Sequence, residues 1–313
     1  MFLALAGGVG GAKLALGLTQ VLPPDELMIV VNTGDDFYHL GLRICPDIDT
    51  VTYTLAGIAN PDTGWGLRDE TWNFMDFQGR LGADTWFRLG DKDLATHLER
   101  TRRLGAGETL SSITALFAKK LGIRHPVVPA TDNEIMTIVK TPDGPLGFQE
   151  YFVRLKCEPV ATGFDFPGAA KAHASPRLEK AFKRDDIEAV IICPSNPYVS
   201  IAPILAVPSI KKFLTTARIP VIAVSPIIGG QAIKGPAAKM MKELGVTPSS
   251  IAVSDYYSRV ASALVIDTAD AHEAEPIRAH GMRVCVTNTV MTTNAEKTQL
   301  AEDVIAFARS LRG

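Results

Sequence analysis

The sequence of 313 residues predicts an α/β protein whose strands form a doubly wound, mostly parallel sheet. Three observations support this prediction. An apolar run at Phe2–Ala6, a glycine-rich turn, an amphipathic stretch and a second apolar run at Leu27–Val31 follow the strand, turn, helix, strand order of a βαβ unit. Towards the C-terminus, apolar runs of strand length again alternate with helical stretches. The composition, 46% hydrophobic and 21% charged, is typical of globular domains and excludes a disordered or fibrous chain.

The first half of the chain predicts a helical insertion after the opening βαβ unit. Residues 62–122 lack a convincing strand pattern, and no low-complexity linker separates them from the rest. We therefore expect a single domain of residues 1–313 that carries residues 62–122 as a small helical subdomain. Helices are expected at residues 67–77, 92–103 and 110–121. Residues 135–141 and 146–154 are expected to form a hairpin or a pair of extended segments.

The second half of the chain predicts the rest of the sheet. Its apolar runs are short and uninterrupted, as in parallel strands buried on both faces. Right-handed crossovers would join them into one sheet. Gly245 and Gly281 directly follow two helical stretches, where glycine usually caps a helix end. Strands are expected at residues 189–193, 221–224, 251–253, 263–266 and 284–286, and helices at residues 211–217, 236–244, 271–280 and 294–311.

Charge and targeting signals narrow the class of protein. The 32 Lys and Arg against 34 Asp and Glu give a net charge of −2, which does not favour a nucleic-acid partner. No apolar run reaches the roughly 18 to 20 residues of a membrane helix, and no basic residue precedes the first apolar run, as it would in a signal peptide. The four cysteines are scattered, without a C-x-x-C pair, which indicates reduced thiols. We expect a cytoplasmic protein with neither a membrane nor a nucleic-acid partner.

The glycine-rich turn at residues 7–11 is the first candidate for ligand binding. Glycines allow a phosphate to approach the backbone closely, and the following helix offers unpaired N–H groups. Leu14 stands where a Walker A loop needs Ser or Thr, and Lys13 occupies the last position of an imperfect G-x-G-x-x-G pattern. The sequence therefore favours phosphate binding over nicotinamide binding, with a tight turn lacking any ligand as the alternative. The expected phosphate-binding residues are Gly8, Gly10, Gly11 and Lys13.

Two further loops follow predicted strands, at the edge where open parallel sheets bind ligands. Ser195 and Asn196 lie between two prolines and carry compact hydrogen-bonding side chains. Gly229 and Gly230 form a second glycine-rich turn. Each loop is expected to contribute to a nucleotide pocket, or else to be a turn with a purely structural role.

An acidic region follows the second predicted strand. Carboxylates two residues apart, such as Asp47 and Asp49, can converge on a hard cation. Asp36, in the Asp35-Asp36 pair, is an alternative ligand for the same cation. The alternative is that Asp47 or Asp49 caps a helix that begins near Thr50.

The predicted insertion is rich in aromatic and basic residues. Trp65, Trp72 and Trp86 could stack on a flat heterocycle, and Arg68 or Arg88 could pair with a phosphate. The alternative, core packing and surface ion pairs, is the more common role of any one such residue.

Several long strings in this sequence resemble the CofD family, the 2-phospho-L-lactate transferases of coenzyme F-420 biosynthesis. The likeness extends from residue 1 to beyond residue 291. The strings are GGVGGAKLALGL at 7–18, NTGDDFYHLGLRICPDIDTVTYTLAG at 32–57, WGLRDETW at 65–72, WFRLGDKDLATHLERT at 86–101, FQEYFVR at 148–154, PSNPYVSIAPIL at 194–205 and AVSPIIGGQAIKGPAAKMM at 223–241.

The resemblance implies a Rossmann-like fold and a magnesium-dependent phosphotransferase. The donor would be guanosine diphosphate carrying a phospholactyl, phosphoenolpyruvyl or phosphoglyceryl group. The acceptor would be the ribityl hydroxyl of 7,8-didemethyl-8-hydroxy-5-deazariboflavin, and GMP would be released. Asp49 and Arg88 match acceptor-binding positions of the family, with Trp65 as a further acceptor contact. Asp49 is the expected catalytic residue, and Asp36, Asp47 and Asp49 are the expected Mg²⁺ ligands.

Two alternative functions are weighed against this expectation. A non-catalytic nucleotide-sugar-binding regulator of the YvcK-like type shares the glycine-rich start but lacks the Pro-Asp-Ile-Asp string at residues 46–49. A nicotinamide-dependent dehydrogenase is disfavoured by Lys13 and by Asn32, which stands where an acidic ribose ligand usually ends the second strand. The sequence does not decide which acid the donor carries. A homodimer is the expected assembly, since most soluble enzymes are symmetric.

Overall fold

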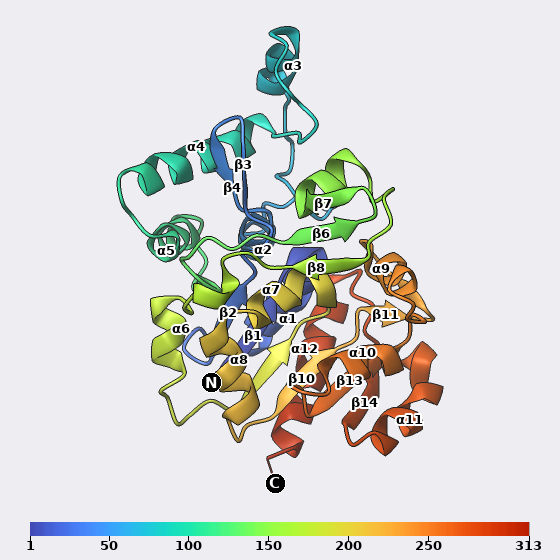
Figure 1. The fold of residues 1–313 in the computed structure, drawn as a ribbon. Helices are drawn as coiled ribbons and strands as arrows, with labels where there is room; N and C mark the ends of the chain where they lie inside the picture. The colour runs from blue at the N-terminus through green and yellow to red at the C-terminus, as the bar shows by residue number, and fades with distance from the viewer. Residues whose placement is uncertain (313) are drawn as a thin grey trace.

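A seven-stranded parallel sheet forms the centre of the computed structural model, which describes residues 1–312. Figure 1 shows this sheet with helices on both of its faces. The first three strands occupy one half of the sheet and the last four the other half, which confirms the doubly wound α/β prediction. The strand order is β14 (Arg283–Thr287), β13 (Ala263–Asp267), β10 (Val221–Val224), β9 (Ala189–Ile192), β1 (Phe2–Ala6), β2 (Leu27–Val31) and β5 (Val127–Pro129).

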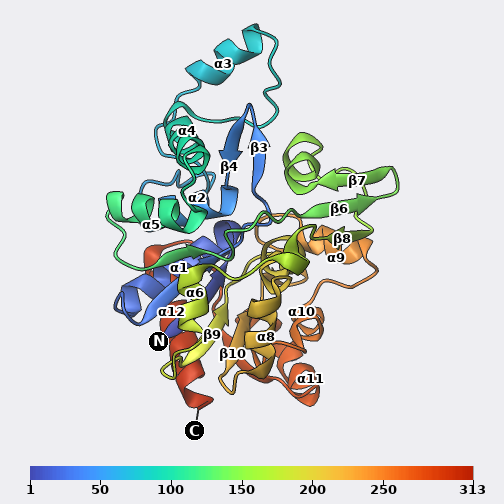
Figure 2. The same cartoon turned by 60° about the vertical axis from the view of Figure 1, so that its left-hand side comes forward.

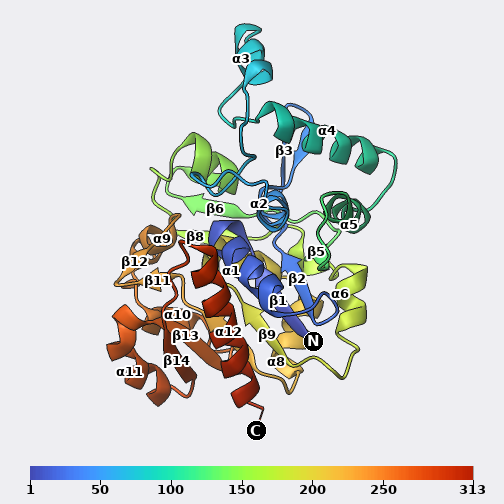
Figure 3. The same ribbon diagram turned by 180° about the vertical axis from the view of Figure 1, so that it is seen from behind.

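Two hydrophobic cores lie on the two faces of this sheet, because successive strand residues point to opposite faces. In β1, Phe2 and Ala4 face one core, and Leu3 and Leu5 face the other. Helices α1 (Gly8–Val21) and α12 (Asn294–Ser310) pack against each other over the first core, as Figure 3 shows. Helices α7 (Ala202–Leu205), α8 (Pro208–Thr216), α9 (Ala237–Glu243) and α10 (Ser250–Tyr257) cover the second.

The remaining elements gather at the C-terminal end of the sheet or at its edges. Figure 2 shows the helices of the predicted insertion above that end, with α3 (Asn73–Arg80) farthest from the sheet. The helices are α2 (Pro46–Leu55), α3 (Asn73–Arg80), α4 (Asp91–Gly105), α5 (Leu110–Lys120), α6 (Pro176–Ala181) and α11 (Ala274–Ala279). The short antiparallel strands are β3 (Phe37–His39), β4 (Leu42–Ile44), β6 (Ile138–Thr141), β7 (Gly144–Gly147), β8 (Gly163–Asp165), β11 (Ile227–Ile228) and β12 (Gln231–Ala232).

Three element predictions were wrong. Residues 251–253 lie inside α10, where Ser249 caps the helix by accepting a hydrogen bond from Ala252 N, so the apolar run is one buried face of a helix. The second arm of the hairpin ends at Gly147, and Glu150–Arg154 forms a π-helical turn instead. Helix α3 begins at Asn73 rather than residue 67. Its first N–H groups are held by the distant carboxylate of Asp91, a contact that local sequence does not show.

Within residues 1–312, no single helix is both long and apolar enough to cross a membrane. One bent pair, Pro197–Leu205 with Pro208–Thr216, meets the test by length and composition alone.

Candidate active site

The strand order changes direction between β1 and β9, and the loops after these strands meet there. Ser195 joins the two loops: its hydroxyl accepts a hydrogen bond from Gly7 N (3.1 Å) and donates one to Gly7 O (2.7 Å). In an open parallel sheet this point is where ligands bind. Ser195 is itself buried, so in this structure it fixes the glycine turn from beneath.

The glycine turn leads from β1 directly into α1, with Gly8 in the left-handed region at φ 59°. A Cβ on Gly10 would lie 2.2 Å from the carbonyl oxygen of Pro194, and one on Gly11 would lie 2.5 Å from Ser195 Oγ. These two glycines are therefore required for α1 to approach the loop after β9. The N–H groups in the first turn of α1 lack intrahelical partners, and this helix end attracts an anion.

Asp47 lies against the start of α1. Its Oδ1 accepts a hydrogen bond from Gly8 N (2.7 Å) and its Oδ2 accepts one from Asn32 Nδ2 (2.9 Å). Helix α2 begins at Pro46, so Asp47 lies within its first turn and does not cap a helix starting near Thr50. Burial raises the pKa of Asp47 to about 6.

Asp35 is the second buried carboxylate beside the glycine turn. Burial first, and the negative charge of Asp47 second, raise the pKa of Asp35 well above its usual value. One of its oxygens accepts a hydrogen bond from Thr137 Oγ1 at 3.3 Å. A hard divalent cation would offset the repulsion between two buried carboxylates and takes oxygen ligands. The chemistry of Asp35 and Asp47 would therefore suit Mg²⁺.

Asp49 and Asp36 are paired with arginines instead. Asp49 forms a two-armed ion pair with Arg100, in which Nη1 donates to Oδ2 at 3.0 Å and Nη2 donates to Oδ1. Asp36 Oδ2 lies 3.4 Å from Arg43 Nη2, its Oδ1 has no partner among the described residues, and burial raises its pKa to about 7. Asp47 and Asp49 contact different elements because residues two apart on a helix are separated by roughly 200°. The three expected metal ligands, Asp36, Asp47 and Asp49, are therefore divided between two environments.

Three lysines surround the first half of α1. Lys13 Nζ donates to Met291 O at 2.7 Å, and its pKa is lowered by burial and by the charges of Lys234 and Lys297. Lys234 Nζ donates to Thr63 O at 3.1 Å, which ties the loop at residues 60–66 to this region. A Cβ on Gly64 would lie 2.8 Å from Val9 Cγ1, so this loop covers the start of α1. The concentration of positive charge would attract a polyanion such as a diphosphate.

The other predicted nucleotide-binding residues make local contacts. Asn196 Oδ1 accepts a hydrogen bond from Tyr198 N at 3.0 Å. Gly229 has φ 56° and Gly230 φ 72°, as the tight turn between β11 and β12 requires. Gly229 N donates to the buried carboxylate of Asp270 at 3.0 Å. These local contacts are enough to explain why Asn and Gly occur at these positions. A nucleotide-binding role for the three residues stays a prediction.

Arg88 and Trp65 lie in the insertion, apart from Asp49. Arg88 is half exposed, lies 3.2 Å from Asp76 Oδ1 and stacks over the ring of Trp72 at 4.6 Å. Trp65 is 51% exposed on the loop at residues 60–66. Among the described residues, neither side chain contacts Asp49. Trp86, in contrast, packs edge-on against His39 and Phe87.

Several residues that shape this region were not predicted as site residues from the sequence. Asp35, Asn32 and Arg100 were not among the expected site residues, although all lie within strings that carry the family resemblance. Asp93, His97 and Arg100 recur at helical spacing on α4, and that spacing was the available signal.

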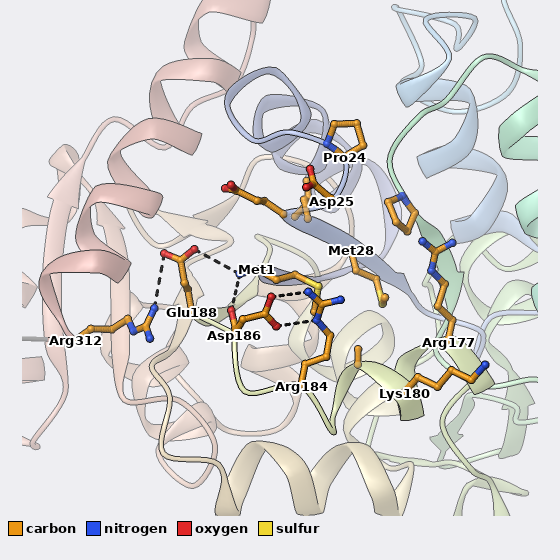
Figure 4. Close-up of a pocket in the computed structure, with 14 residues that line it drawn as sticks. Met1, Pro24, Asp25, Met28, Arg177, Lys180, Arg184, Asp186, Glu188 and Arg312 are labelled. Atoms are coloured by element: carbon orange, nitrogen blue, oxygen red, sulfur yellow. Dashed lines mark hydrogen bonds and ion pairs between the residues drawn. The ribbon is translucent and has the colours of Figure 1, made fainter.

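A separate cavity of about 840 Å³ opens at the opposite end of the sheet, where Met1 lies (Figure 4). Its walls bring together charges of both signs that pair with each other: the N-terminal amine donates to Asp186 O at 2.7 Å, and Arg184 pairs with Asp186. Because ligands of such sheets bind at the other end, this cavity is not the candidate active site.

Comparisons with known proteins agree with the resemblance. The profile of the family "2-phospho-L-lactate transferase CofD" matches residues 2–304. The phosphoenolpyruvate transferase of Streptomyces avermitilis is 38% identical over 316 residues, covering 98% of each chain. That of Mycolicibacterium smegmatis is 39% identical, covering 92% of each chain. The 2-phospho-L-lactate transferase of Methanosarcina acetivorans is 35% identical, covering 97% of each chain.

Solved structures support the fold. A protein of the UPF0052 family from Bacillus halodurans superposes with a TM-score of 0.61, covering 97% of this chain and 98% of its own. At 14% identity this likeness shows the fold alone.

Proposed function

Because this chain belongs to the CofD family of 2-phospho-L-lactate transferases, we propose that it performs the family's transfer between β1 and β9, over the glycine turn. It is a transferase of the phospholactyl or phosphoenolpyruvyl type in coenzyme F-420 biosynthesis. The observation that best supports this placement is the pair of buried carboxylates, Asp35 and Asp47, beside the N-terminus of α1. This arrangement suits a metal-bound diphosphate.

The donor is a guanosine diphosphate whose terminal phosphate carries the acid. Its diphosphate lies at the N-terminus of α1, where the helix dipole, Lys13 and Lys234 offset its charge. The loops at Ser195–Asn196 and Gly229–Gly230 border the remainder of the nucleotide. In the reaction, the acceptor hydroxyl oxygen bonds to the acid-bearing phosphorus, the bond from that phosphorus to the bridging oxygen breaks, and GMP leaves with the electron pair.

Asp35 and Asp47 would hold the magnesium ion. The ion would supply positive charge to offset the charge that develops on the transferred phosphate. Since both of these carboxylates would bind the cation, the proton of the acceptor hydroxyl passes to the carboxylate of Asp49 instead. Asp49, whose charge is matched by Arg100, orients that hydroxyl.

The deazaflavin ring binds under the insertion, near Arg88 and Trp65. Both side chains are half exposed, and both belong to loops above the C-terminal end of the sheet. Arg88→Ala should raise the acceptor KM more than the donor KM, because Arg88 touches the acceptor alone. Steady-state kinetics with each substrate varied in turn measures this difference, and equal changes in both KM values would limit Arg88 to a structural role.

The direct test is product analysis. The protein is incubated with deazaflavin, Mg²⁺ and, in separate reactions, the lactyl, enolpyruvyl and glyceryl donors, and the products are separated by chromatography. GMP and a modified deazaflavin are expected together. The enolpyruvyl donor should react fastest, since the relatives at 38–39% identity are phosphoenolpyruvate transferases. Nucleotide binding without either product from any donor would favour the non-catalytic regulator.

A further inference from the structure

A buried polar network connects α2 to α4. The α2–α4 network consists of Asp49 and Tyr53 on α2, and of Asp93, His97 and Arg100 on α4. The spacing of four residues on α2, and of four and three on α4, places each set on one face of its helix. The two faces meet, so a helix of the insertion is joined to the helix that carries Asp47 and Asp49.

Each member of the network lies close to the next. Tyr53 Oη donates to Asp93 Oδ1 at 2.6 Å, and Asp93 Oδ2 lies 3.3 Å from His97 Nε2. His97 Nδ1 lies 3.3 Å from Arg100 Nη1, and Arg100 holds both oxygens of Asp49. Because a guanidinium only donates hydrogen bonds, a hydrogen bond between Arg100 and His97 requires His97 to accept it at Nδ1.

Four of the five members are almost entirely enclosed, and the side chain of Asp93 is 17% exposed. Arg100 and His97 are each 1% exposed, Tyr53 is 2% and Asp49 is 6%. A buried ion pair loses much hydration energy, and apolar residues of similar size often pack at least as well in its place. Stability alone therefore gives little reason for an arginine here. A fixed bidentate contact instead sets the position and rotation of a carboxylate, which a flexible lysine or an apolar side chain does not.

Metal binding is the competing explanation for the same residues. Ligand atoms of Asp49, Asp93 and His97 lie within 4.8 Å of one another, and His97 Nε2 is buried without a hydrogen-bond partner. However, Arg100 already occupies both oxygens of Asp49. A cation at this point would lie beside a buried positive charge, and the repulsion is strong where water is excluded.

We propose that Arg100, held in place by His97 and Asp93, is a positioning residue that orients Asp49 and aligns the insertion with the sheet for the transfer. The inference rests on the proposed role of Asp49 towards the acceptor hydroxyl. Arg100 acts through Asp49 and touches no substrate. It follows that Arg100 affects the acceptor side of the reaction and not the nucleotide side.

The test uses Arg100→Lys, which keeps the charge, and Arg100→Met, which keeps much of the volume. Arg102→Met is the matched control, because Arg102 lies on the same helix with a 61% exposed side chain. We expect Arg100→Lys to lower kcat by about 10-fold or more, as misplacement of a reacting group does, and to weaken acceptor binding. The Kd for GDP should change by less than about twofold, and Arg102→Met should match the wild type. Wild-type kcat and acceptor binding in Arg100→Lys would overturn the proposal.

A double-mutant cycle separates positioning from general support of the fold. If Arg100 acts through Asp49, then Asp49→Asn combined with Arg100→Met should be no slower than the slower single variant. Additive losses in kcat would overturn the proposal. If the wild type releases no GMP, the proposed function fails instead. The inference is then tested by quenching of deazaflavin fluorescence: weaker acceptor binding by Arg100→Lys with unchanged GDP binding supports it, and equal acceptor binding overturns it.

A metal titration completes the test. Calorimetry with Mg²⁺ and with Zn²⁺ is carried out on the wild type and on His97→Gln. We expect His97→Gln to bind both ions as the wild type does. Loss of a binding event in His97→Gln would assign the α2–α4 network to a metal and overturn the positioning role.

Discussion

At the scale of single residues, the partner of Asp49 changes what its substitution should do. Asp49→Asn removes one charge of a buried ion pair and leaves Arg100 uncompensated. We expect kcat to fall on the order of 10²-fold, the scale of losing one positioned polar group in a transition state. The free energy of unfolding should also fall, by roughly 3 kcal/mol or more, because a buried charge loses its partner.

Steady-state kinetics and chemical unfolding of Asp49→Asn measure the two effects separately. A helix-capping role would instead predict nearly unchanged stability, because Asn caps a helix about as well as Asp. A near-normal kcat across a Mg²⁺ titration would contradict the catalytic and metal roles together. Recovery of the rate at high Mg²⁺ would select the metal role for Asp49.

The buried carboxylates predict how stability depends on pH. Burial raises the pKa of Asp36 to about 7 and of Asp47 to about 6, and the pKa of Asp35 is raised as well. A group whose pKa is higher in the folded state binds its proton more tightly there, so its contribution to stability is lost as pH rises from roughly 4 to 7. A bound cation favours the ionised carboxylates and opposes this loss.

Thermal unfolding measured with and without Mg²⁺ tests that dependence. The metal-free protein should have a higher Tm near pH 5.5 than near pH 7.5, and Mg²⁺ should raise Tm more at about pH 7.5. Asp47→Asn should reduce the increase caused by Mg²⁺. An increase of equal size at both pH values would contradict cation binding at Asp35 and Asp47.

At the scale of elements, the close packing of α1 against the loop after β9 is enough to explain why the turn contains glycines. Gly10→Ala places a Cβ 2.2 Å from Pro194 O, so α1 must shift, at a cost of about 1 to 3 kcal/mol. Gly105, in the last turn of α4, has open space around it and an ordinary φ. Gly105→Ala is therefore the control, and it should stabilise the protein by roughly 0.5 to 1 kcal/mol.

Unfolding by urea measures both glycine variants. GDP binding by the folded fraction of Gly10→Ala then separates packing from ligand approach. Affinity lost without any loss of stability would show that Gly10 lines the phosphate site, as the sequence alone predicted.

Two sets of contacts attach the insertion to the rest of the molecule. Lys234 binds the loop at residues 60–66 over α1, and the α2–α4 network fixes α4 on α2. Nearer the tip of the insertion, Asp84 forms a long and exposed ion pair with Arg154, at 4.0 Å. Buried contacts lie at the base of the insertion and exposed ones at its tip, so any adjustment to the acceptor should involve α3 before α4.

At the scale of the whole molecule, the site between β1 and β9 should select a guanosine diphosphate over a nicotinamide dinucleotide. Lys13 lies where the third small residue of a dinucleotide fingerprint would pack, and Asn32, directly after β2, donates a hydrogen bond from its amide to Asp47. Calorimetry should show GDP binding and no detectable NAD binding. NAD binding tighter than GDP would contradict this assignment of the site.

The sequence by itself determined the fold class, the main strands and the family. The periodicity of apolar residues and the long motifs can both be read directly from the order of residues. It also indicated the loops at which the site is proposed, since ligand sites of parallel sheets follow from strand direction. It did not find β5, a three-residue edge strand too short for a periodic signal, nor the true nature of residues 251–253.

Only the tertiary structure decided which carboxylates lie close to one another. Asp47 and Asp49 are two residues apart in the chain, yet the helical rotation between them directs one to Gly8 and the other to Arg100. Asp35 and Asp47, twelve residues apart, become neighbours because the loop after β2 and the start of α2 converge on the glycine turn. Burial then sets their charge, and burial depends on the packing of the whole molecule rather than on any local string of residues.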